Sequence, residues 1–143
     1  MNVTQKEVPR LSELVPKCLE ACDTAYVPHS KFQVGCALVA RNEAGDERLF
    51  SGCNVENASL GATICAERTA MVKAISEGYT QFPTVMVTSV SSDQFVAPCG
   101  IFRQFMREFG TDIRVILLNA KTKQLKSFTL DQLLPESFGP GAF

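Results

Sequence analysis

Two short stretches of sequence decide how this chain is organised: Cys65-Ala66-Glu67-Arg68 and Pro98-Cys99-Gly100-Ile101-Phe102-Arg103-Gln104. In each of them a cysteine stands where a loop is expected to open into a helix. The unpaired N–H groups and the dipole of a helix start stabilise negative charge, so they favour the thiolate form of a cysteine. Because a thiol binds zinc only as a thiolate, both stretches are candidates for holding a metal ion.

The spacing of the two stretches is typical of a zinc site that hydrolyses an amine. Such a site has a ligand, any residue and then Glu, followed later by Pro-Cys-x-x-Cys. Cys65-x-Glu67 matches the first half and Pro98-Cys99 opens the second, while Phe102 stands where the last cysteine belongs. A lone buried cysteine is usually core packing, so either half alone would indicate little. The two halves in this order are far more specific.

Charged residues beside the two cysteines suit the same chemistry. Glu67 is close enough to Cys65 to reach a metal-bound water without being a ligand itself, and a carboxylate there can pass the water's proton to a leaving amine. Arg68 and Arg103 each lie within a few residues of a ligand position, where a guanidinium group offsets the charge of thiolates on one dication. We therefore interpret Glu67 as the catalytic acid and base and the two arginines as charge-balancing residues.

Composition and charge limit the classes of function. With 143 residues, 45% of them hydrophobic, the chain fits one domain covering residues 1–143, and no linker is visible. The net charge of −1 gives no electrostatic footprint for nucleic acid, and no apolar run is long enough to cross a membrane. Met1–Lys6 lacks the apolar core of a secretory signal, so we expect a cytoplasmic protein whose six cysteines are reduced thiols or metal ligands. The expected partners are small molecules or other copies of the chain.

Hydrophobic periodicity and turn residues predict an α/β fold. The first helix should run to about Asp23, and it should either start near Pro16 or bend there, because proline removes a helix hydrogen bond. Thr129-x-x-Gln132 is a capping-box pattern for a last short helix before Pro135, and the C-terminal tail after it is expected to be irregular. An opening hairpin followed by alternating helices and strands gives a three-layer α/β/α domain, with the two cysteine-bearing helix starts at one end of a mixed five-stranded sheet. The expected strands are about 33–40, 48–53, 84–90, 113–118 and 125–128, and the helices between them run from about Cys65 to Gly78 and from about Cys99 to Gly110.

Further motifs extend along nearly the whole chain. With the two cysteine stretches they are Tyr26-x-Pro28-x-Ser30-x-Phe32-x-Val34-Gly35, Asn54-x-Glu56-Asn57-Ala58 and Ser137-Phe138-Gly139-Pro140. Together they resemble the cytidine deaminases of the small, homotetrameric, zinc-dependent class. The resemblance implies the fold of that class and an enzyme of pyrimidine salvage, which converts cytidine or deoxycytidine to uridine or deoxyuridine by attack of a zinc-bound water.

The resemblance also implies roles for single residues. Glu67 would be the proton shuttle, and Cys65 and Cys99 would be two of three zinc ligands. A homotetramer would share its active sites, because Phe138 of one subunit would help to line a neighbour's pocket. The residues expected to contact the pyrimidine nucleoside are Phe32 against the base, Asn54 and Glu56 at the ribose hydroxyls, Ala66 and Phe138.

Two positions depart from the pattern of the family, and both fall in the site. Phe102 replaces the third zinc cysteine. Because Cys99 and Phe102 share one helical turn, we expect the phenyl ring to point to where that sulfur would be and to intrude on the metal's space. Catalytic zinc ordinarily keeps three protein ligands and a water. Leu60 replaces a tyrosine near the nucleoside and the subunit contact, which removes a hydroxyl group from the sugar end.

Other residues could supply the missing ligand, but each has a simpler structural explanation. Cys36 and Cys53 suit strands as small buried residues, and His29, the single histidine, suits an exposed loop beside a proline. Several residues of the motifs and helices have structural explanations too: Phe32, Met71, Phe105 and Met106 as packing, and Asn54 and Asn57 as turn or cap residues.

The sequence leaves three functions open. The first is hydrolytic deamination, which Glu67, the two cysteines and the two arginines favour. The second is a zinc-free, catalytically inactive relative, a pseudoenzyme that binds nucleoside or serves as a structural or regulatory subunit, and Phe102 and Leu60 favour it. The third is a purely structural zinc site, which faces the same shortage of ligands.

Overall fold

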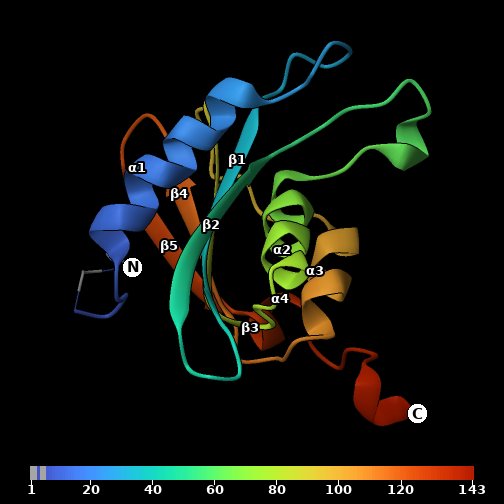
Figure 1. Cartoon of the computed structure of the whole chain (residues 1–143). Helices are drawn as coiled ribbons and strands as arrows, with labels where there is room; N and C mark the ends of the chain where they lie inside the picture. Colours follow the sequence, from blue (N-terminus) through green and yellow to red (C-terminus); the bar gives the residue numbers. More distant parts are fainter. Residues whose placement is uncertain (1–2, 4–5) are drawn as a thin grey trace.

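A computed structural model describes residue 3 and residues 6–143 of the chain (Figure 1). In the segment Met1–Lys6, where we expect no secretory signal, residues 1, 2, 4 and 5 lie outside the described residues. In the described part, no helix combines the length and the apolar character that crossing a membrane requires.

A mixed five-stranded sheet forms the middle of the fold. Its strands lie in the order β2-β1-β3-β4-β5; β3 and β4 run parallel, and the other neighbours run antiparallel. Most positions of β1, β3 and β4 are buried, which explains why these strands are nearly continuous apolar runs in the sequence. The bounds are β1 Val34–Arg41, β2 Glu47–Cys53, β3 Gln81–Ser89, β4 Arg114–Asn119 and β5 Leu125–Thr129, so the five predicted strands are present.

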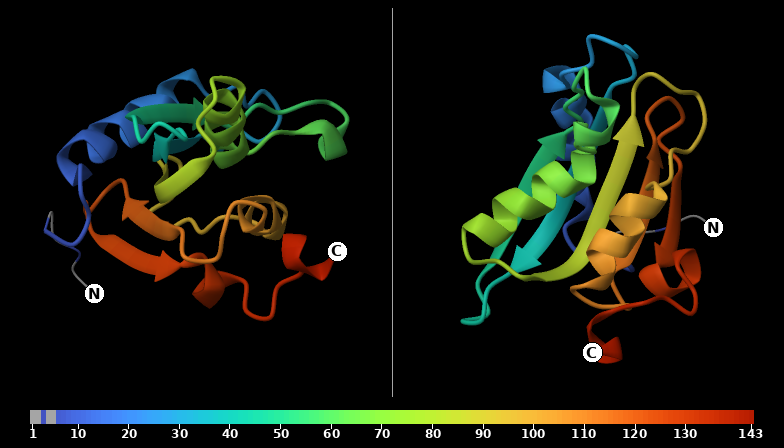
Figure 2. Two further views of the ribbon diagram at one scale, coloured as in Figure 1. Left: turned by 60° about the horizontal axis from the view of Figure 1, so that its bottom comes forward. Right: turned by 90° about the vertical axis from the view of Figure 1, so that its right-hand side faces the viewer.

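Helices cover both faces of this sheet and complete the three predicted layers (Figure 2). The first helix lies on one face, and the second and third lie side by side on the other. Successive strand residues serve the two faces in turn: on β1, Ala37 and Val39 pack in the cluster with α1, whereas Cys36 and Leu38 pack in the cluster with α2 and α3. The bounds are α1 Leu11–Ala21, α2 Ala66–Ser76, α3 Gly100–Arg107 and α4 Leu130–Leu133.

The start of α1 differs from one of the two alternatives predicted. The helix begins at Leu11 and contains Pro16, so it does not start near the proline. Leu14 and Cys18 are fully buried on either side of Pro16, and this packing holds the helix through it. The helix ends at Ala21, and Asp23 lies in the 3₁₀ turn that follows.

The other helix ends follow the local signals. At α4, the Gln132 N–H donates to Thr129 Oγ1 at 3.3 Å and the Thr129 N–H donates to Gln132 Oε1 at 2.9 Å, so the predicted capping box is confirmed. Gly78 and Gly110, just beyond α2 and α3, have φ values of 91° and 138°, which suit glycine best. The tail after Pro135 contains one short 3₁₀ turn, Pro140–Ala142.

The first turn of α2, just after Cys65, lies very close to β2. A Cβ atom on Gly52 of β2 would lie 2.6 Å from the Ala70 backbone nitrogen and 2.8 Å from the Ala66 carbonyl oxygen. Only a glycine allows the helix backbone to lie so near the strand. Gly52 therefore sets the depth of the first turn of α2.

Candidate functional site

A pocket of about 370 Å³ lies where the starts of α2 and α3 meet the loop after β2. The predicted site residues on its wall are Asn54, Cys65, Ala66, Glu67, Arg68 and Cys99, and Leu60 also lines it. Phe32, Glu56, Arg103 and Phe138 are not among its lining residues. The structure thus brings the two cysteine stretches together, as predicted, and leaves part of the predicted nucleoside contacts outside this pocket.

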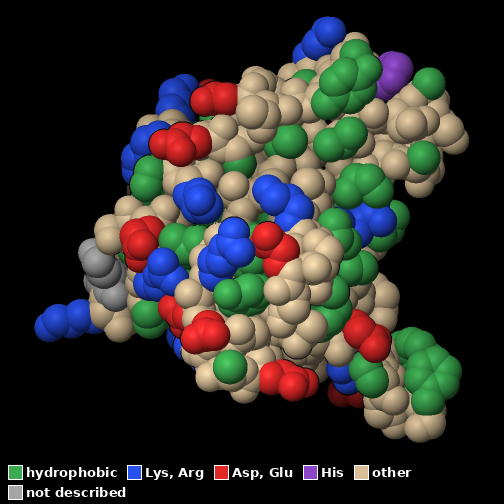
Figure 3. Space-filling view, viewed as in Figure 1, with side chains coloured by type: hydrophobic (Ala, Val, Ile, Leu, Met, Phe, Trp, Pro, Cys, Tyr) green, Lys and Arg blue, Asp and Glu red, His purple; other side chains and the backbone are tan. Residues whose placement is uncertain are grey.

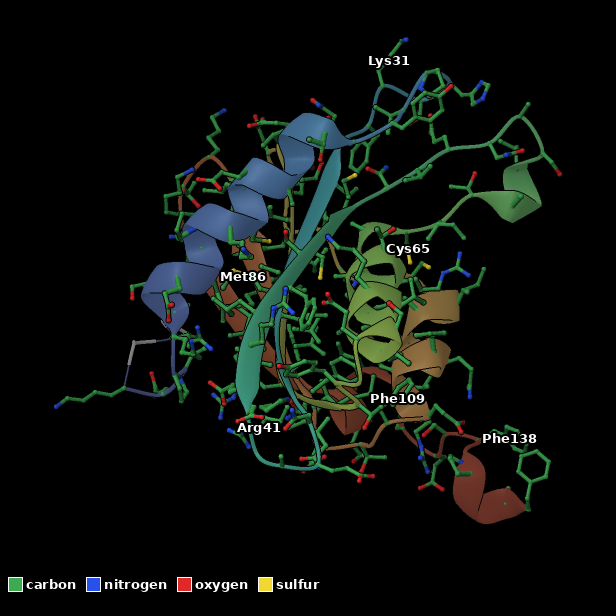
Figure 4. The ribbon with its side chains drawn as sticks, viewed as in Figure 1. Lys31, Arg41, Cys65, Met86, Phe109 and Phe138 are labelled. Carbon is green, nitrogen blue, oxygen red and sulfur yellow. The ribbon has the colours of Figure 1, made fainter. Side chains whose placement is uncertain are left out.

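The two cysteines occupy equivalent positions in the backbone. Cys65 is the N-cap of α2 and Cys99 is the N-cap of α3, so each stands at the opening of a helix as the sequence predicts. Figure 4 shows Cys65 at the start of α2, next to α3. Burial raises the pKa of the Cys65 thiol, and the nearby Glu67 raises it further, while hydrogen bonds from Arg68 act in the opposite direction. Burial therefore outweighs the helix start at this thiol.

Glu67 is a buried carboxyl group at the wall of the pocket. Only 4% of the residue is exposed, although carboxylates are rarely buried without a partner. Burial raises its pKa, and hydrogen bonds to its own backbone and to Cys65, together with the charge of Arg68, only partly offset this. No ion pair involves Glu67 among the residues that the structure describes. A raised pKa makes it easier for a carboxyl group to hold a proton and pass it on, as a general acid and base must.

The two arginines have different roles in the structure. Arg68 donates from Nε to the Cys65 sulfur at 3.4 Å and from Nη2 to the Thr63 carbonyl at 2.8 Å, so its charge lies beside a thiol. Arg103 donates from Nε to the Pro98 carbonyl and from Nη1 to the Leu133 carbonyl, both at 2.8 Å. These bonds fasten the start of α3 to the end of α4. Arg103 thereby supports the loop that ends at the second cysteine.

Phe102 lies in the core of the protein. The residue is fully buried in the cluster beneath α2 and α3, and its ring stacks on Phe105 with centroids 6.5 Å apart. The ring does not line the pocket. That it stands where the third zinc sulfur would be remains a prediction. Burial against apolar neighbours stabilises a phenyl ring, which accounts for its place in this cluster.

The residues of the pocket do not form the three-ligand site that a catalytic zinc ordinarily has. Within residue 3 and residues 6–143, no group of three or more His, Cys, Asp or Glu side chains is placed to hold a metal ion. Cys36 is fully buried in the core, the Cys53 thiol donates to the Thr24 carbonyl at 3.4 Å, and His29 lies at the surface, where Figure 3 shows the single histidine. None of these three replaces the missing cysteine. Cys65 and Cys99 remain the two thiols at the cavity.

The motif residues at the sugar end hold a loop in this structure. Asn54 Oδ1 accepts from the Val34 N–H at 2.9 Å, and Asn54 Nδ2 donates to the Phe32 carbonyl at 2.8 Å. Glu56 Oε1 accepts from the backbone N–H groups of His29 and Ser30, each at 3.0 Å. Hydrogen bonds from Ser30 and then from His29 lower the pKa of this carboxyl group. Both residues therefore fix the loop that carries Phe32, in addition to any contact with a ligand.

Large apolar side chains are exposed around the pocket and at the C-terminal segment. Leu60 is 76% exposed and Ile101 is 66% exposed, and both line the pocket. Phe138 is 60% exposed on the C-terminal segment, away from Cys65, and packs against Phe143 (Figure 4). On the face seen in Figure 3, basic and acidic side chains are interspersed, so this face carries no basic stripe for nucleic acid.

Sequence reasoning missed some of the residues that shape the pocket. Val34, Thr63 and Ile101 line it, as do Val96 and Ala97 in the loop before Cys99. Val34 and Ile101 belong to the motifs quoted from the sequence, but neither has a chemical group that would mark it as a site residue. Thr63 could have been noticed only through its carbonyl, which holds Arg68, and a backbone contact leaves no mark in the sequence.

Two thiols at helix starts and a buried carboxyl group beside one of them, at one end of a mixed sheet, match the pattern of zinc deaminase sites except at Phe102. The model of the cytidine and deoxycytidylate deaminase zinc-binding region matches residues 9–118. A probable cytidine deaminase of Dictyostelium discoideum is 44% identical over 130 residues, which cover 88% of this chain and 84% of the relative. The cytidine deaminase of Sporosarcina psychrophila is 37% identical over 128 residues, which cover 90% of each chain. The chain therefore belongs to the cytidine and deoxycytidylate deaminase family.

Solved structures confirm the fold. The cytidine deaminase from Burkholderia pseudomallei matches with a TM-score of 0.80 at 38% identity, over 90% of this chain and 98% of that one. The cytidine deaminase from Mycobacterium tuberculosis matches with a TM-score of 0.72 at 31% identity, over 90% of this chain and 96% of that one. The expected α/β deaminase fold with its mixed five-stranded sheet is thus confirmed.

Proposed function

We propose that the pocket at the starts of α2 and α3 binds cytidine or deoxycytidine, and that hydrolytic removal of the 4-amino group is the reaction it serves. The observation that carries this proposal is Glu67, a nearly fully buried carboxyl group on the pocket wall beside Cys65. Burying such a group is costly, and its raised pKa suits proton transfer. The relatives named above support the choice of substrate.

In this proposal the residues of the chain bind, orient and move protons. Glu67 takes a proton from the attacking water and delivers it to the departing amine, as a proton shuttle. Ala66 presents its backbone to the base from the first turn of α2, and Asn54, on the pocket wall, contacts the ribose. Arg68 keeps positive charge beside the Cys65 sulfur. Zinc, which activates water in the proposed reaction, would have only Cys65 and Cys99 as protein ligands.

A second candidate function is favoured by a different observation. Phe102 is fully buried in the core and offers no donor atom, so the third ligand is missing from this chain. A protein with this pocket and no firmly held metal would bind the nucleoside without turning it over. It would then act as a pseudoenzyme, either as a nucleoside-binding protein or as a structural or regulatory subunit.

Zinc content and turnover together separate the two candidates. We would purify the chain without chelators, determine zinc per chain by elemental analysis, and assay ammonia release from cytidine and deoxycytidine. Zinc near one per chain with turnover that Glu67→Gln abolishes supports deamination. The matched control is Glu77→Gln, because Glu77 lies just after the same helix, exposed and paired with Arg48 at 3.2 Å. Nucleoside binding with neither zinc nor turnover supports the nucleoside-binding form of the second candidate. Absence of nucleoside binding contradicts deamination and leaves only a structural or regulatory subunit.

We further propose that residues 1–143 form a single domain and that the chain assembles as a cytoplasmic homotetramer with shared active sites, in pyrimidine salvage. Exposed Leu60 and Ile101 at the pocket and exposed Phe138 support the assembly, because a monomer gains nothing by leaving such side chains in water. Light scattering coupled to size exclusion measures the mass in solution. A monomer at micromolar concentration would contradict the shared-site assembly.

A further inference from the structure

Two serines at the end of β3 hold the loop that leads into β1. Ser89 Oγ donates to the Gln33 carbonyl at 2.6 Å. Ser91 Oγ accepts from the Gln33 N–H at 2.9 Å and donates to the Lys31 carbonyl at 3.4 Å. The Ser91 N–H in turn donates to Ser89 Oγ at 3.1 Å. Each hydroxyl thus gives its one proton to the loop, and together they grip both polar groups of the Gln33 backbone.

The residue that the two serines hold, Gln33, is a direct neighbour of a pocket residue. Gln33 lies between Phe32 and Val34, and Val34 lines the pocket with Asn54. Asn54 holds the Phe32 carbonyl and the Val34 N–H from the other side. The loop backbone at residues 32–34 is therefore clamped between the end of β3 and the loop after β2. A shift at Gln33 moves both of its neighbours.

The loop also contains a strained residue, Lys31, whose carbonyl is held by Ser91. Lys31 has φ +61°, in the left-handed region that side chains other than glycine rarely adopt. Its carbonyl accepts from Ser91, and its side chain points outward from the loop (Figure 4). Without this contact, the strained residue next to Phe32 would relax more readily.

We propose that Ser91, together with Ser89, is a positioning residue for nucleoside binding, acting through Gln33 on Phe32 and Val34. The inference rests on the proposed function, because it assumes that a nucleoside occupies this pocket. Ser91 does not line the pocket and is exposed, so it acts on the ligand only through the loop.

The same geometry separates this role from a general contribution to stability. The paired residues of β1 and β3 end at Val34 and Ser89, so the Ser91 contacts lie beyond the last ladder pair. Ser91 is exposed and Gln33 is half-buried, so water can replace the lost hydrogen bonds when the hydroxyl is removed. Loss of the hydroxyl should loosen the loop without unfolding the sheet.

The test compares Ser91→Ala with Ser91→Thr and Ser92→Ala. Threonine keeps the hydroxyl, and Ser92 is a matched control because its Oγ accepts only from the Gln94 N–H, at 3.0 Å, among the contacts that the described residues show. Amide hydrogen exchange without ligand reports on residues 31–33, and calorimetric titration reports on affinity for cytidine and for uridine. Thermal unfolding checks that the fold is intact.

Ser91→Ala should exchange faster at residues 31–33 and bind nucleoside about fivefold to tenfold more weakly, roughly the worth of one neutral hydrogen bond. Ser91→Thr should restore both, and Ser92→Ala should change neither. If the unaltered chain binds nucleoside and Ser91→Ala binds it equally tightly while its loop exchanges faster, the positioning role is overturned and the proposed function stands. If the unaltered chain binds neither nucleoside, the proposed function fails and the positioning role fails with it.

Discussion

Replacing Phe102 with cysteine tests whether the phenyl ring stands in the place of a metal ligand. Phe102 is fully buried, so removal of its ring leaves a cavity in the cluster beneath α2 and α3. Phe→Ala changes in cores cost about 3–5 kcal/mol, and the sulfur of cysteine keeps part of the lost volume, so Phe102→Cys should lower the free energy of unfolding by about 2–4 kcal/mol without metal.

Zinc should return much of that stability to Phe102→Cys. A ligand that binds only the folded chain stabilises it by about 2.7 kcal/mol when its free concentration is a hundred times its dissociation constant. With Cys65 and Cys99 at the same cavity, the new thiol would complete a three-thiolate set. We also expect zinc to stay bound to this variant through dialysis, and some deamination of cytidine to appear or to increase.

The assay is urea unfolding of each protein with excess zinc and with a chelator. Phe102→Ser is the matched control, because its side chain is close to cysteine in size but has no thiolate. The reasoning predicts that zinc stabilises Phe102→Cys by at least about 2 kcal/mol more than Phe102→Ser. An equal response of the two variants to zinc would refute it, because the ring would then not occupy a ligand position. If the variant holds zinc and still fails to deaminate, the fault lies elsewhere, with Leu60 as the first candidate.

Three further predictions follow from single contacts. Gly52→Ala should lower the free energy of unfolding by about 1–3 kcal/mol or more, because its Cβ would meet α2 backbone atoms at 2.6 and 2.8 Å. Gly61→Ala is the control: its added Cβ would meet open space, so it should change the free energy by no more than about 0.5 kcal/mol in the same denaturation assay. Arg103→Ala should cost about 2–4 kcal/mol in thermal unfolding, because it loses two charge-assisted hydrogen bonds to carbonyl groups that hold α3 to α4. Glu56 has a lowered pKa in the folded state, because Ser30 and the His29 N–H donate hydrogen bonds to its carboxylate. These hydrogen bonds should be fully formed above the ordinary pKa of a glutamate and should be lost as the pH falls through the lower folded pKa. Amide exchange at residues 29 and 30 should follow this loss, and Glu56→Gln should remove that part of its pH dependence.

Local patterns in the sequence were enough for much of the fold. The capping box at Thr129 and Gln132 is present, and Cys65 and Cys99 both cap helices, because each of these features depends on a few neighbouring residues. Strand bounds were predicted to within a few residues, since hydrophobic runs of this length fit a buried sheet. Of the two alternatives at Pro16, only a helix start there is excluded, because α1 begins at Leu11 and is held through the proline by the burial of Leu14 and Cys18.

Tertiary contacts decided the parts of the site that the sequence left open. Arg103 was expected to balance the charge of thiolates, which stays a prediction; its hydrogen bonds run to carbonyl groups, one of them at the distant end of α4. Asn54 and Glu56 were expected to hold a ribose, and in the structure both hold backbone groups of the loop that carries Phe32. These partners are far away along the chain, and no local pattern indicates them.

The sequence alone determined which chemical groups this protein has: two cysteines at helix starts, a glutamate beside one of them, and a phenylalanine where the motif would have a third cysteine. It determined them because ligand type and spacing are properties of the chain itself. Only the tertiary structure decided that the Phe102 ring lies in the core and that Glu67 is buried at the pocket wall, which raises its pKa. Burial depends on what the rest of the chain packs around a residue, and it sets both the apolar contacts of a ring and the desolvation of a carboxyl group.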